Sequence, residues 1–373
     1  MSILSEQLLS LAPRIEERSH SILAELANSI APSEQVTPLL EICHKSLEEG
    51  KRFRAFLAFV GGSLFTHAPI ETLPLDDLGA SLELYQASAL VHDDIIDHAP
   101  TRRGNPSAHA AFSSYHRSTH FRGDSEDFGI SSAILAGDLL FSAAESAMIR
   151  QCENLSHYRD PVMQLYARMH AEVAIGQFLD ISAEQRPLDT NDSEAINAST
   201  ALTIVSHKAA NYSVVIPATL GALAMGASPL DADALGMVLA PWGHAFQLRD
   251  DELGVFGDPQ ITGKGAGDDL REGKRTYLLA LTWQNASTSE REKLARGLGN
   301  PEMTHHELDE LRDIVARRGR KLHEEVISTF EAQGFLALES SRFTPEQRDI
   351  LSQVAAMLIK RSKRGKQSFA APA

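Results

Sequence analysis

Cysteines and basic residues are scarce in this sequence, and each shortage argues against a class of protein. The 373 residues include two cysteines, Cys43 and Cys152, which are too few for a disulfide framework and lack metal-ligand spacing. Lysine and arginine (35) are outnumbered by aspartate and glutamate (50), which gives a formal net charge of -15. We therefore expect no nucleic-acid partner. An anionic substrate would need metal ions or a local basic cluster in order to bind.

Long apolar runs are also missing. The most apolar stretch, residues 214–227, is interrupted by Pro217, Thr219 and Gly221. It is also shorter than the roughly 20 residues that span a bilayer. Residues 1–20 lack the basic region and the long apolar region of a signal peptide. We therefore expect a cytoplasmic protein without a membrane span.

Strand-like alternation is rare, whereas apolar residues recur at intervals of three and four along most of the chain. One such stripe consists of Leu75, Leu78, Leu82, Tyr85 and Ala89. This spacing is typical of amphipathic helices. No change in composition marks a domain boundary. The sequence therefore predicts an all-α fold without a sheet, in one domain over residues 1–373.

Two segments are expected to lie outside the helices. The Ser-, His- and Gly-rich stretch from Ser113 to Gly129 is predicted to be a loop, and a basic tail near 361–373 is predicted to fray into solvent. His116 and His120 are four residues apart, which raises the possibility of a zinc site. Their position in a polar loop favours solvent-exposed histidines instead.

Three aspartates continue one of the apolar stripes. On a helix, Asp97 would lie beside both Asp93 and Asp94, because residues three and four apart are neighbours. Carboxylates this close repel one another unless a cation lies between them. Mg²⁺ suits such a group, since it combines one or two carboxylates with water and phosphate oxygens. An acidic helix end in solvent is the simpler alternative, but these residues continue a face that should be buried, which favours a site.

A second acidic cluster follows a later apolar segment. Asp250 and Asp251 are adjacent, and Lys264 and Lys274 lie shortly downstream. A pair of adjacent aspartates is weak evidence by itself. Two acidic clusters, each with basic residues nearby, indicate a common ligand, namely a diphosphate held by metal ions and cationic side chains.

Several ordered motifs between Gly50 and Tyr277 resemble the trans-isoprenyl diphosphate synthase (polyprenyl synthetase) family, most of all bacterial geranylgeranyl diphosphate synthases. The matching residues are Gly50, Lys51, Arg52 and Arg54; Asp93, Asp94 and Asp97; Arg102, Arg103, Gly104 and Pro106; Gly176, Gln177 and Asp180; Lys208 and Tyr212; Gln247, Asp250 and Asp251; Gly257, Asp258, Gly263, Lys264, Gly267 and Asp268; and Lys274. Two positions depart from the family pattern. Gly254 replaces a third aspartate, and Ala209 replaces a threonine after Lys208.

The resemblance implies a single bundle of mostly antiparallel helices around a central cavity. It also implies a magnesium-dependent prenyltransferase that adds isopentenyl diphosphate head to tail to an allylic diphosphate, in the E configuration. Three Mg²⁺ ions would bridge the allylic diphosphate to the protein. Their direct ligands would be Asp93, Asp97 and Asp250, supported by Asp94, Asp180 and Asp251. Family members usually form homodimers, and we expect the same here.

The resemblance also assigns roles to basic and polar residues. The leaving diphosphate would be neutralised by Arg102, Lys208 and Lys264. Isopentenyl diphosphate would be held by Lys51, Arg54 and Arg103, with Gln86 as a further polar contact. Gln247 and Lys274 are additional substrate-binding candidates.

The residues that precede the first aspartates bear on product length. Family members with short products carry aromatic residues at the two positions held here by Ser88 and Ala89, which are both small. Tyr85 would lie about 12 Å below Asp93 at 1.5 Å per residue and is a candidate floor of the pocket. The C20 product geranylgeranyl diphosphate is our interpretation. Farnesyl diphosphate and longer chains are the alternatives.

Two other functions remain open at this point. A class I terpene cyclase also ionises prenyl diphosphates with an aspartate motif, but the Asp250–Asp251 pair and the basic residues Lys51 and Arg54 favour a synthase. A non-catalytic subunit of a heteromeric synthase would be marked by degraded aspartates, and here the first motif is complete.

Overall fold

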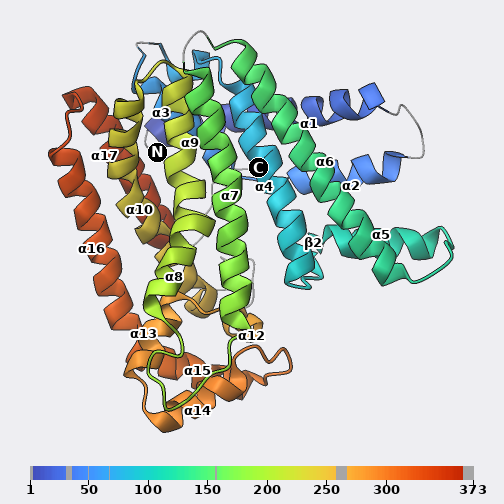
Figure 1. Cartoon of the computed structure of the whole chain (residues 1–373), viewed down its shortest axis with the longest axis vertical. Coiled ribbons are helices and arrows are strands. Elements are labelled where there is room, and N and C mark those ends of the chain that lie inside the picture. The colour runs from blue at the N-terminus through green and yellow to red at the C-terminus, as the bar shows by residue number, and fades with distance from the viewer. Residues whose placement is uncertain are drawn as a thin grey trace. The chain divides into compact units, whose positions relative to one another are not determined.

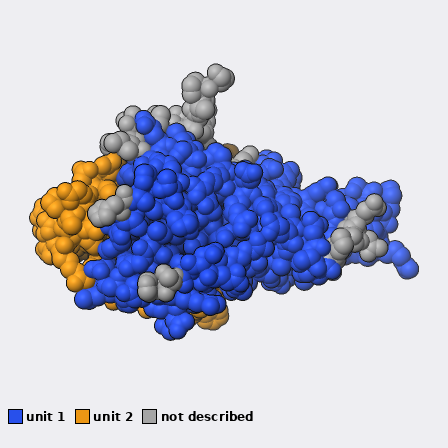
Figure 2. All heavy atoms as spheres, turned by 90° about the horizontal axis from the view of Figure 1, so that it is seen from above, with its two compact units in different colours: residues 1–164, 217–232 blue, residues 165–216, 233–373 orange. Residues whose placement is uncertain are grey.

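The computed structural model describes residues 3–30, 36–48, 50–66, 68–155, 158–257 and 267–363, which are almost entirely helical (Figure 1). The all-α prediction is confirmed. The chain divides into two compact units, shown in different colours in Figure 2. Unit 1 comprises residues 1–164 and 217–232, and unit 2 comprises residues 165–216 and 233–373. A single domain over the whole chain stays a prediction.

Unit 1 consists of helices and one short hairpin. Its elements are α1 (Ile3–Ile30), α2 (Thr37–Leu47), α3 (Phe53–Ser63), the 3₁₀ turn η2 (Ile70–Thr72), α4 (Asp76–Ile96), β1 (Thr101–Arg102), β2 (Asn105–Pro106), α5 (Ala108–Ser118), α6 (Ser125–Glu153) and α9 (Ile216–Ala224). Helix α4 packs against α6, α1 and α3, and α5 packs against α6. The helix that carries the first aspartates is therefore enclosed on several sides.

Unit 2 contains the remaining helices, two of which begin in unit 1. Its elements are α7 (Arg159–Glu184), α8 (Ala198–Ile204), the π-helix η3 (Val205–Val215), α10 (Pro229–Phe256), α12 (Asp268–Glu272), α13 (Tyr277–Asn285), α14 (Thr288–Gly297), α15 (His305–Arg318), α16 (Arg320–Glu339) and α17 (Pro345–Lys363). One core cluster packs Leu278 and Trp283 against Leu311 and Val315. Helix α17 extends three residues into the predicted basic tail, and residues 364–373 lie outside the described residues.

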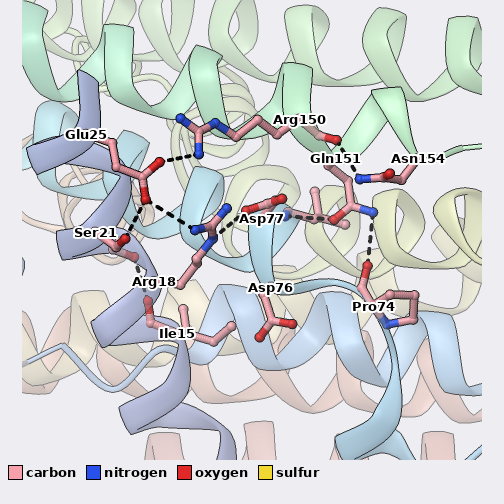
Figure 3. Close-up of polar contacts among 12 residues, drawn as sticks. Ile15, Arg18, Ser21, Glu25, Pro74, Asp76, Asp77, Arg150, Gln151 and Asn154 are labelled. Carbon is pink, nitrogen blue, oxygen red and sulfur yellow. Dashed lines mark hydrogen bonds and ion pairs between the residues drawn. The ribbon is translucent and has the colours of Figure 1, made fainter. Parts of the chain in front are cut away.

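The first turn of α4 is anchored by polar contacts from α1 and α6 (Figure 3). Arg18 Nε donates to Asp77 Oδ1 at 2.7 Å. The Gln151 side chain accepts from the Leu78 amide at 3.1 Å and donates to the Pro74 carbonyl at 3.1 Å. A negatively charged side chain in the first turn interacts favourably with the positive end of the helix dipole. The Gln151 carbonyl satisfies an amide that the first turn of a helix leaves open.

The segment predicted as a loop is largely helical, so that prediction is wrong. Residues 113–118 form the end of α5, residues 125–129 form the start of α6, and a short connection joins them. The His116 side chain is buried, and its ring lies 5.8 Å from that of Phe121 and 5.1 Å from that of Phe128 between centroids. His116 is therefore not the solvent-exposed residue that was expected, whereas His120 is exposed. A few well-spaced apolar residues suffice to bury one face of a polar helix.

Helix α6 contains a long apolar window. It is the one described helix that is long and apolar enough to cross a membrane, by length and composition alone. In its most apolar window, 44% of the residues are buried inside the structure, and the helix packs against α4 and α5. The core helix of a globular unit meets the same criteria.

One histidine of unit 2 is enclosed without hydrogen bonds. His323 of α16 is 0% exposed, and neither ring nitrogen has a partner within the described part of the chain. Burial, with a smaller contribution from Arg249, lowers the pKa of His323 to about 4. The folded protein therefore holds this imidazole in its neutral form.

Replacing His323 with leucine is expected to make stability less sensitive to acid. In the unfolded chain the imidazole titrates near pH 6.5. Acidification from about pH 6.5 to about pH 4 thus protonates the unfolded state alone and removes about 3 kcal/mol of stability from the wild-type protein. Urea denaturation of both proteins at neutral and acidic pH measures this difference. Equal losses of stability in the two proteins would contradict the assignment.

Candidate active site

The first three aspartates lie at the C-terminal end of α4, but they do not share one environment. Asp97 caps the helix, and its amide donates to the Asp93 carbonyl at 2.8 Å. Asp93 and Asp97 are partly exposed, whereas Asp94 is 3% exposed. The carboxylates of Asp93 and Asp97 are therefore accessible to a ligand, and that of Asp94 is enclosed by unit 1.

A hairpin follows these aspartates, although the sequence analysis expected no sheet. Strands β1 and β2 pair antiparallel, and the two residues between them, Arg103 and Gly104, have φ values of 53° and 83°. Positive φ at both central residues is the property of a type I′ turn, whose twist matches that of paired strands. The consequence is that two adjacent arginines contact different parts of unit 1.

The two arginines fix the ends of α4 and α2. Arg102 forms an ion pair with Asp94, in which Nε donates to Oδ1 at 2.7 Å, and its Nη2 lies 3.8 Å from Asp93 Oδ2. Burial raises the pKa of Asp94, and the Arg102 guanidinium opposes that shift. Arg103 Nη1 donates to the Glu48 carbonyl at 3.0 Å. Arg102 thus offsets much of the cost of enclosing a carboxylate.

Beside the hairpin is a small recess with a cavity volume of about 60 Å³. Its lining includes Arg102, Arg103, Lys45 and Leu90. The other residues expected to hold isopentenyl diphosphate also belong to unit 1. Lys51 is exposed, and Arg54 and Gln86 are half-buried.

The candidate chain-length residues differ in exposure. Ser88 is 2% exposed, whereas Ala89 is half-buried. Tyr85 is 6% exposed and packs edge-on against Phe141 of α6, with ring centroids 5.9 Å apart. The sequence analysis did not identify Phe141, because no local pattern shows which residue of α6 meets Tyr85. The candidate floor is therefore an aromatic pair.

In unit 2 a lysine and an aspartate meet across two helices. Lys208 Nζ of η3 lies 2.5 Å from Asp180 Oδ2 of α7. Gly176 permits this approach, since a Cβ atom there would lie 2.7 Å from the Lys208 amide nitrogen. The Asn211 side chain donates to the buried Glu172 carboxylate at 2.8 Å and further ties η3 to α7. Helical segments with π geometry are frequent at functional sites.

The second acidic cluster lies at the C-terminal end of α10. Asp250 is exposed, and Asp251 accepts a hydrogen bond from Gln247 Nε2 at 3.0 Å. Burial, together with the charges of Asp269, Asp250 and Asp180, raises the pKa of Asp251 well above its usual range, while the hydrogen bond from Gln247 opposes the shift. Such a concentration of negative charge favours the binding of a cation.

One acid beside this cluster was not identified from the sequence. The motif resemblance names Asp268, whereas the carboxylate whose charge acts on Asp251 is that of Asp269. A Cβ atom built on Gly254 would lie 1.8 Å from Asp269 Oδ2, so this side chain fills the space beside the missing third aspartate. Asp268 and Asp269 are the first two residues of α12. The adjacent pair of aspartates was the available signal, but a sequence does not show which one faces α10.

Other basic residues have structural partners. Lys274 Nζ lies 2.5 Å from Glu272 Oε2 and 4.0 Å from Asp269 Oδ1. Arg249, which the sequence analysis did not select, is buried and forms a two-pronged ion pair with Glu324, anchoring α10 to α16 just before the aspartates. The motif residues Asp258, Gly263 and Lys264 lie outside the described residues.

The acids fit a metal that takes only part of its coordination from protein. Among the described residues, no three His, Cys, Asp or Glu side chains form a group that could hold a metal by itself. Mg²⁺ commonly binds one or two carboxylates and completes its coordination with water and phosphate oxygens. The exposed Asp250 carboxylate and the half-exposed Asp93 carboxylate suit that mode.

Comparison with known proteins identifies the family. Residues 36–315 match the family described as Polyprenyl synthetase. The chain belongs to the polyprenyl synthetase family. It is 27% identical over 353 residues to a short chain isoprenyl diphosphate synthase of Methanothermobacter thermautotrophicus, covering 93% of this chain and 94% of that protein. It is 29% identical over 276 residues to a geranylgeranyl diphosphate synthase of Sulfolobus acidocaldarius, covering 74% and 75%.

A solved structure agrees with this assignment. The geranylgeranyl pyrophosphate synthase of Corynebacterium glutamicum, in complex with isoprenyl diphosphate and magnesium, superposes with a TM-score of 0.84 at 34% identity and covers 95% of this chain and 98% of that chain. The polyprenyl synthetase described here is accordingly a prenyltransferase of isoprenoid biosynthesis. The relatives named here are synthases, which favours that function over a terpene cyclase.

Replacing Gly176 with alanine is expected to separate η3 from α7 and to weaken the Lys208–Asp180 contact. Overpacking of this kind costs about 1–3 kcal/mol, and prenyltransferase activity should fall with it. Gly243→Ala is the matched control. It places a methyl group near the same π-helix, where the nearest atom is the Ala210 carbonyl oxygen at 3.2 Å. Urea denaturation and activity assays compare the two variants. Equal effects would show that the close approach at Gly176 is unimportant.

Proposed function

We propose that this polyprenyl synthetase condenses isopentenyl diphosphate with an allylic diphosphate, head to tail and in the E configuration, and releases geranylgeranyl diphosphate. The proposal is carried by two separate carboxylate clusters, each with its own cationic partner. Arg102 contacts Asp94 in unit 1, and Lys208 contacts Asp180 in unit 2. A homodimer is part of the proposal, and the exposed Leu135 of α6, at 61%, offers apolar surface for it.

The exposure of most of the aspartates supports a division of roles. Asp93 and Asp97 are half-exposed and Asp250 is exposed, and these three are proposed as ligands of three Mg²⁺ ions. Asp94 and Asp180 are buried beside Arg102 and Lys208 and are proposed as supporting residues, together with Asp251, which is half-exposed and accepts a hydrogen bond from Gln247. Bound magnesium would supply positive charge to the leaving diphosphate and so favour ionisation of the allylic bond.

The cationic side chains are proposed to act at two diphosphate groups. Arg102, Lys208 and Lys264 neutralise the allylic diphosphate as it departs. Isopentenyl diphosphate is held by Lys51, Arg54 and Arg103, with Gln86 as a further contact, and Gln247 and Lys274 complete the polar surroundings of the substrates. The double bond of isopentenyl diphosphate attacks the allylic cation, and the departing diphosphate takes up the proton that is lost. Water must be excluded, because it would convert the cation to an alcohol.

The product of the wild-type enzyme is expected to be C20, with the Tyr85–Phe141 pair as the floor of the pocket. Tyr85→Ala removes one ring of that pair, and the doubly substituted Tyr85→Ala/Phe141→Ala protein removes both. We expect products of C25 or longer, and in higher proportion from the double variant. Ala89→Phe places a ring about 6 Å from the level of Asp93 and should shorten the product. Ala89 is a better site for this test than the buried Ser88.

The measurement is an incubation of each protein with Mg²⁺, labelled isopentenyl diphosphate and each allylic primer, followed by dephosphorylation and chromatography. Unchanged product length in Tyr85→Ala and in the double variant would remove the aromatic pair as the floor. No condensation with any primer would overturn the proposed function itself.

The missing third aspartate is proposed to be replaced by Asp269. Its carboxylate lies where a side chain at position 254 would begin, and its charge acts on Asp251. The position is also fixed through the backbone, because the Gly267 amide donates to the Gly254 carbonyl at 3.1 Å. A carboxylate at 254 and one at 269 would compete for the same space.

Restoring the family residue should therefore weaken metal binding rather than improve it. Gly254→Asp displaces the Asp269 carboxylate, and Asp269→Asn removes its charge. We expect each change to reduce magnesium affinity by about tenfold, as losses of supporting groups do. Calorimetric titration with Mg²⁺ and inorganic pyrophosphate measures this without turnover. Asp268→Asn is the control for loss of a neighbouring charge, and it should change the magnesium affinity little. Tighter magnesium binding by Gly254→Asp would show that Asp269 does not take the place of the missing third aspartate.

A further inference from the structure

Of the three basic residues around the start of α3, Lys51, Arg52 and Arg54, the middle one is buried. Lys51 is exposed and Arg54 is half-buried, whereas Arg52 is 4% exposed. Lys51, Arg52 and Arg54 are close together in sequence, but they differ clearly in solvent exposure. A guanidinium buried to this extent is directed at protein groups rather than at a substrate.

The partners of Arg52 come from three different helices. Its Nη2 donates to the carbonyl of Leu47, the last residue of α2, and lies 3.0 Å from Glu16 Oε2 of α1. Its Nη1 lies 3.6 Å from Glu83 Oε2 of α4. The guanidinium also covers Gly50, where a Cβ atom would lie 2.3 Å from Nη1. One side chain therefore fixes the loop 50–52 against α1, α2 and α4.

The carboxylate that meets Arg52 also holds the start of α3. Glu83 is 5% exposed, and its Oε1 accepts a hydrogen bond from the Ala55 amide at 3.3 Å. The N-cap residue of α3 is Arg52 itself, and its side chain makes no capping hydrogen bond. Glu83 thus supplies from another helix the acceptor that an N-terminal amide requires.

The backbone of Arg52 is held in an unusual conformation. It has φ of 50° and ψ of 34°, in the left-handed region. A residue other than glycine persists there only when its surroundings impose the conformation. The ion pairs of Arg52 to Glu16 and Glu83 hold the side chain of this residue, which lies between Lys51 and Arg54 in the chain.

We infer that Arg52 is a positioning residue, which together with Glu83 orients Lys51 and Arg54 toward the diphosphate of isopentenyl diphosphate. This inference rests on the proposed function, which assigns the diphosphate to Lys51 and Arg54. Arg52 itself does not contact the substrate. Its fork of donors spans Leu47, Glu16 and Glu83 at once, which the single ammonium group of a lysine does not reproduce.

The test is Arg52→Lys, which keeps the charge and loses the fork. The binding of isopentenyl diphosphate alone, measured by calorimetry without Mg²⁺, should weaken by about tenfold, as expected for the loss of charged hydrogen bonds. In the full reaction, KM for isopentenyl diphosphate should rise by a similar factor. KM for the allylic substrate and kcat should stay within about twofold, because the acidic clusters are untouched.

Glu83→Gln approaches the same contact from the other side and provides a second variant if Arg52→Lys does not fold. It keeps an acceptor for the Ala55 amide and removes the charge that pairs with Arg52, so a selective loss of isopentenyl diphosphate binding is again expected. Arg18→Lys is the matched control. Arg18 also links α1 to α4, through its contact with Asp77 at 2.7 Å, and its replacement should leave isopentenyl diphosphate binding unchanged.

Failure of the inference and failure of the proposed function give different results. Lys51→Met and Arg54→Met remove the proposed ligands directly. If these two variants lose affinity for isopentenyl diphosphate while folded Arg52→Lys and Glu83→Gln bind it normally, Arg52 has no positioning role. If Lys51→Met and Arg54→Met also bind normally, the assignment of the diphosphate to these residues is wrong, and the inference about Arg52 is overturned with it.

Discussion

Carboxylates gathered at the ends of helices repel one another and lose hydration, and the candidate active site depends on how this protein offsets both effects. Arg102 meets Asp94, and Lys208 meets Asp180. Each partner is held by another element, the cation of Asp94 by a hairpin and that of Asp180 by a π-helix. Asp94 and Asp180 are thus held beside cations, while the Asp250 carboxylate is exposed to solvent. Positive charge is thus distributed before any substrate arrives.

Much of this was predictable, because it depends on local spacing. Apolar residues at intervals of three and four predicted the helices, and the interruption of one stripe by Asp93 and Asp97 predicted the end of α4 as a site. Helical geometry alone does not show that Asp94 is enclosed. Its environment is determined by Arg102, which lies in the first strand of the hairpin, just before a two-residue turn with positive φ at both positions. That contact depends on tertiary structure, which periodicity does not report.

The features that the sequence did not reveal have the same physical origin. Polar composition predicts a loop over 113–129, yet most of this stretch is helical, and His116 is buried beside two aromatic rings. Asp268 and Asp269 are indistinguishable in sequence, and only the packing of α12 on α10 separates them. Arg52 likewise resembled its neighbours, although it is buried. In each case the deciding quantity is burial, to which residues distant in sequence contribute.

Gly254 shows why counting the residues of a motif is a poor measure of a site. By sequence, the second cluster has lost a carboxylate. In the structure, the absence of a side chain at this position lets α12 approach α10 closely, and the Asp269 carboxylate occupies the space that is left. Coulomb energy depends on where charges lie and not on which helix carries them. After burial, the Asp269 charge contributes to the raised pKa of Asp251, so α12 supplies negative charge beside this cluster although position 254 carries none.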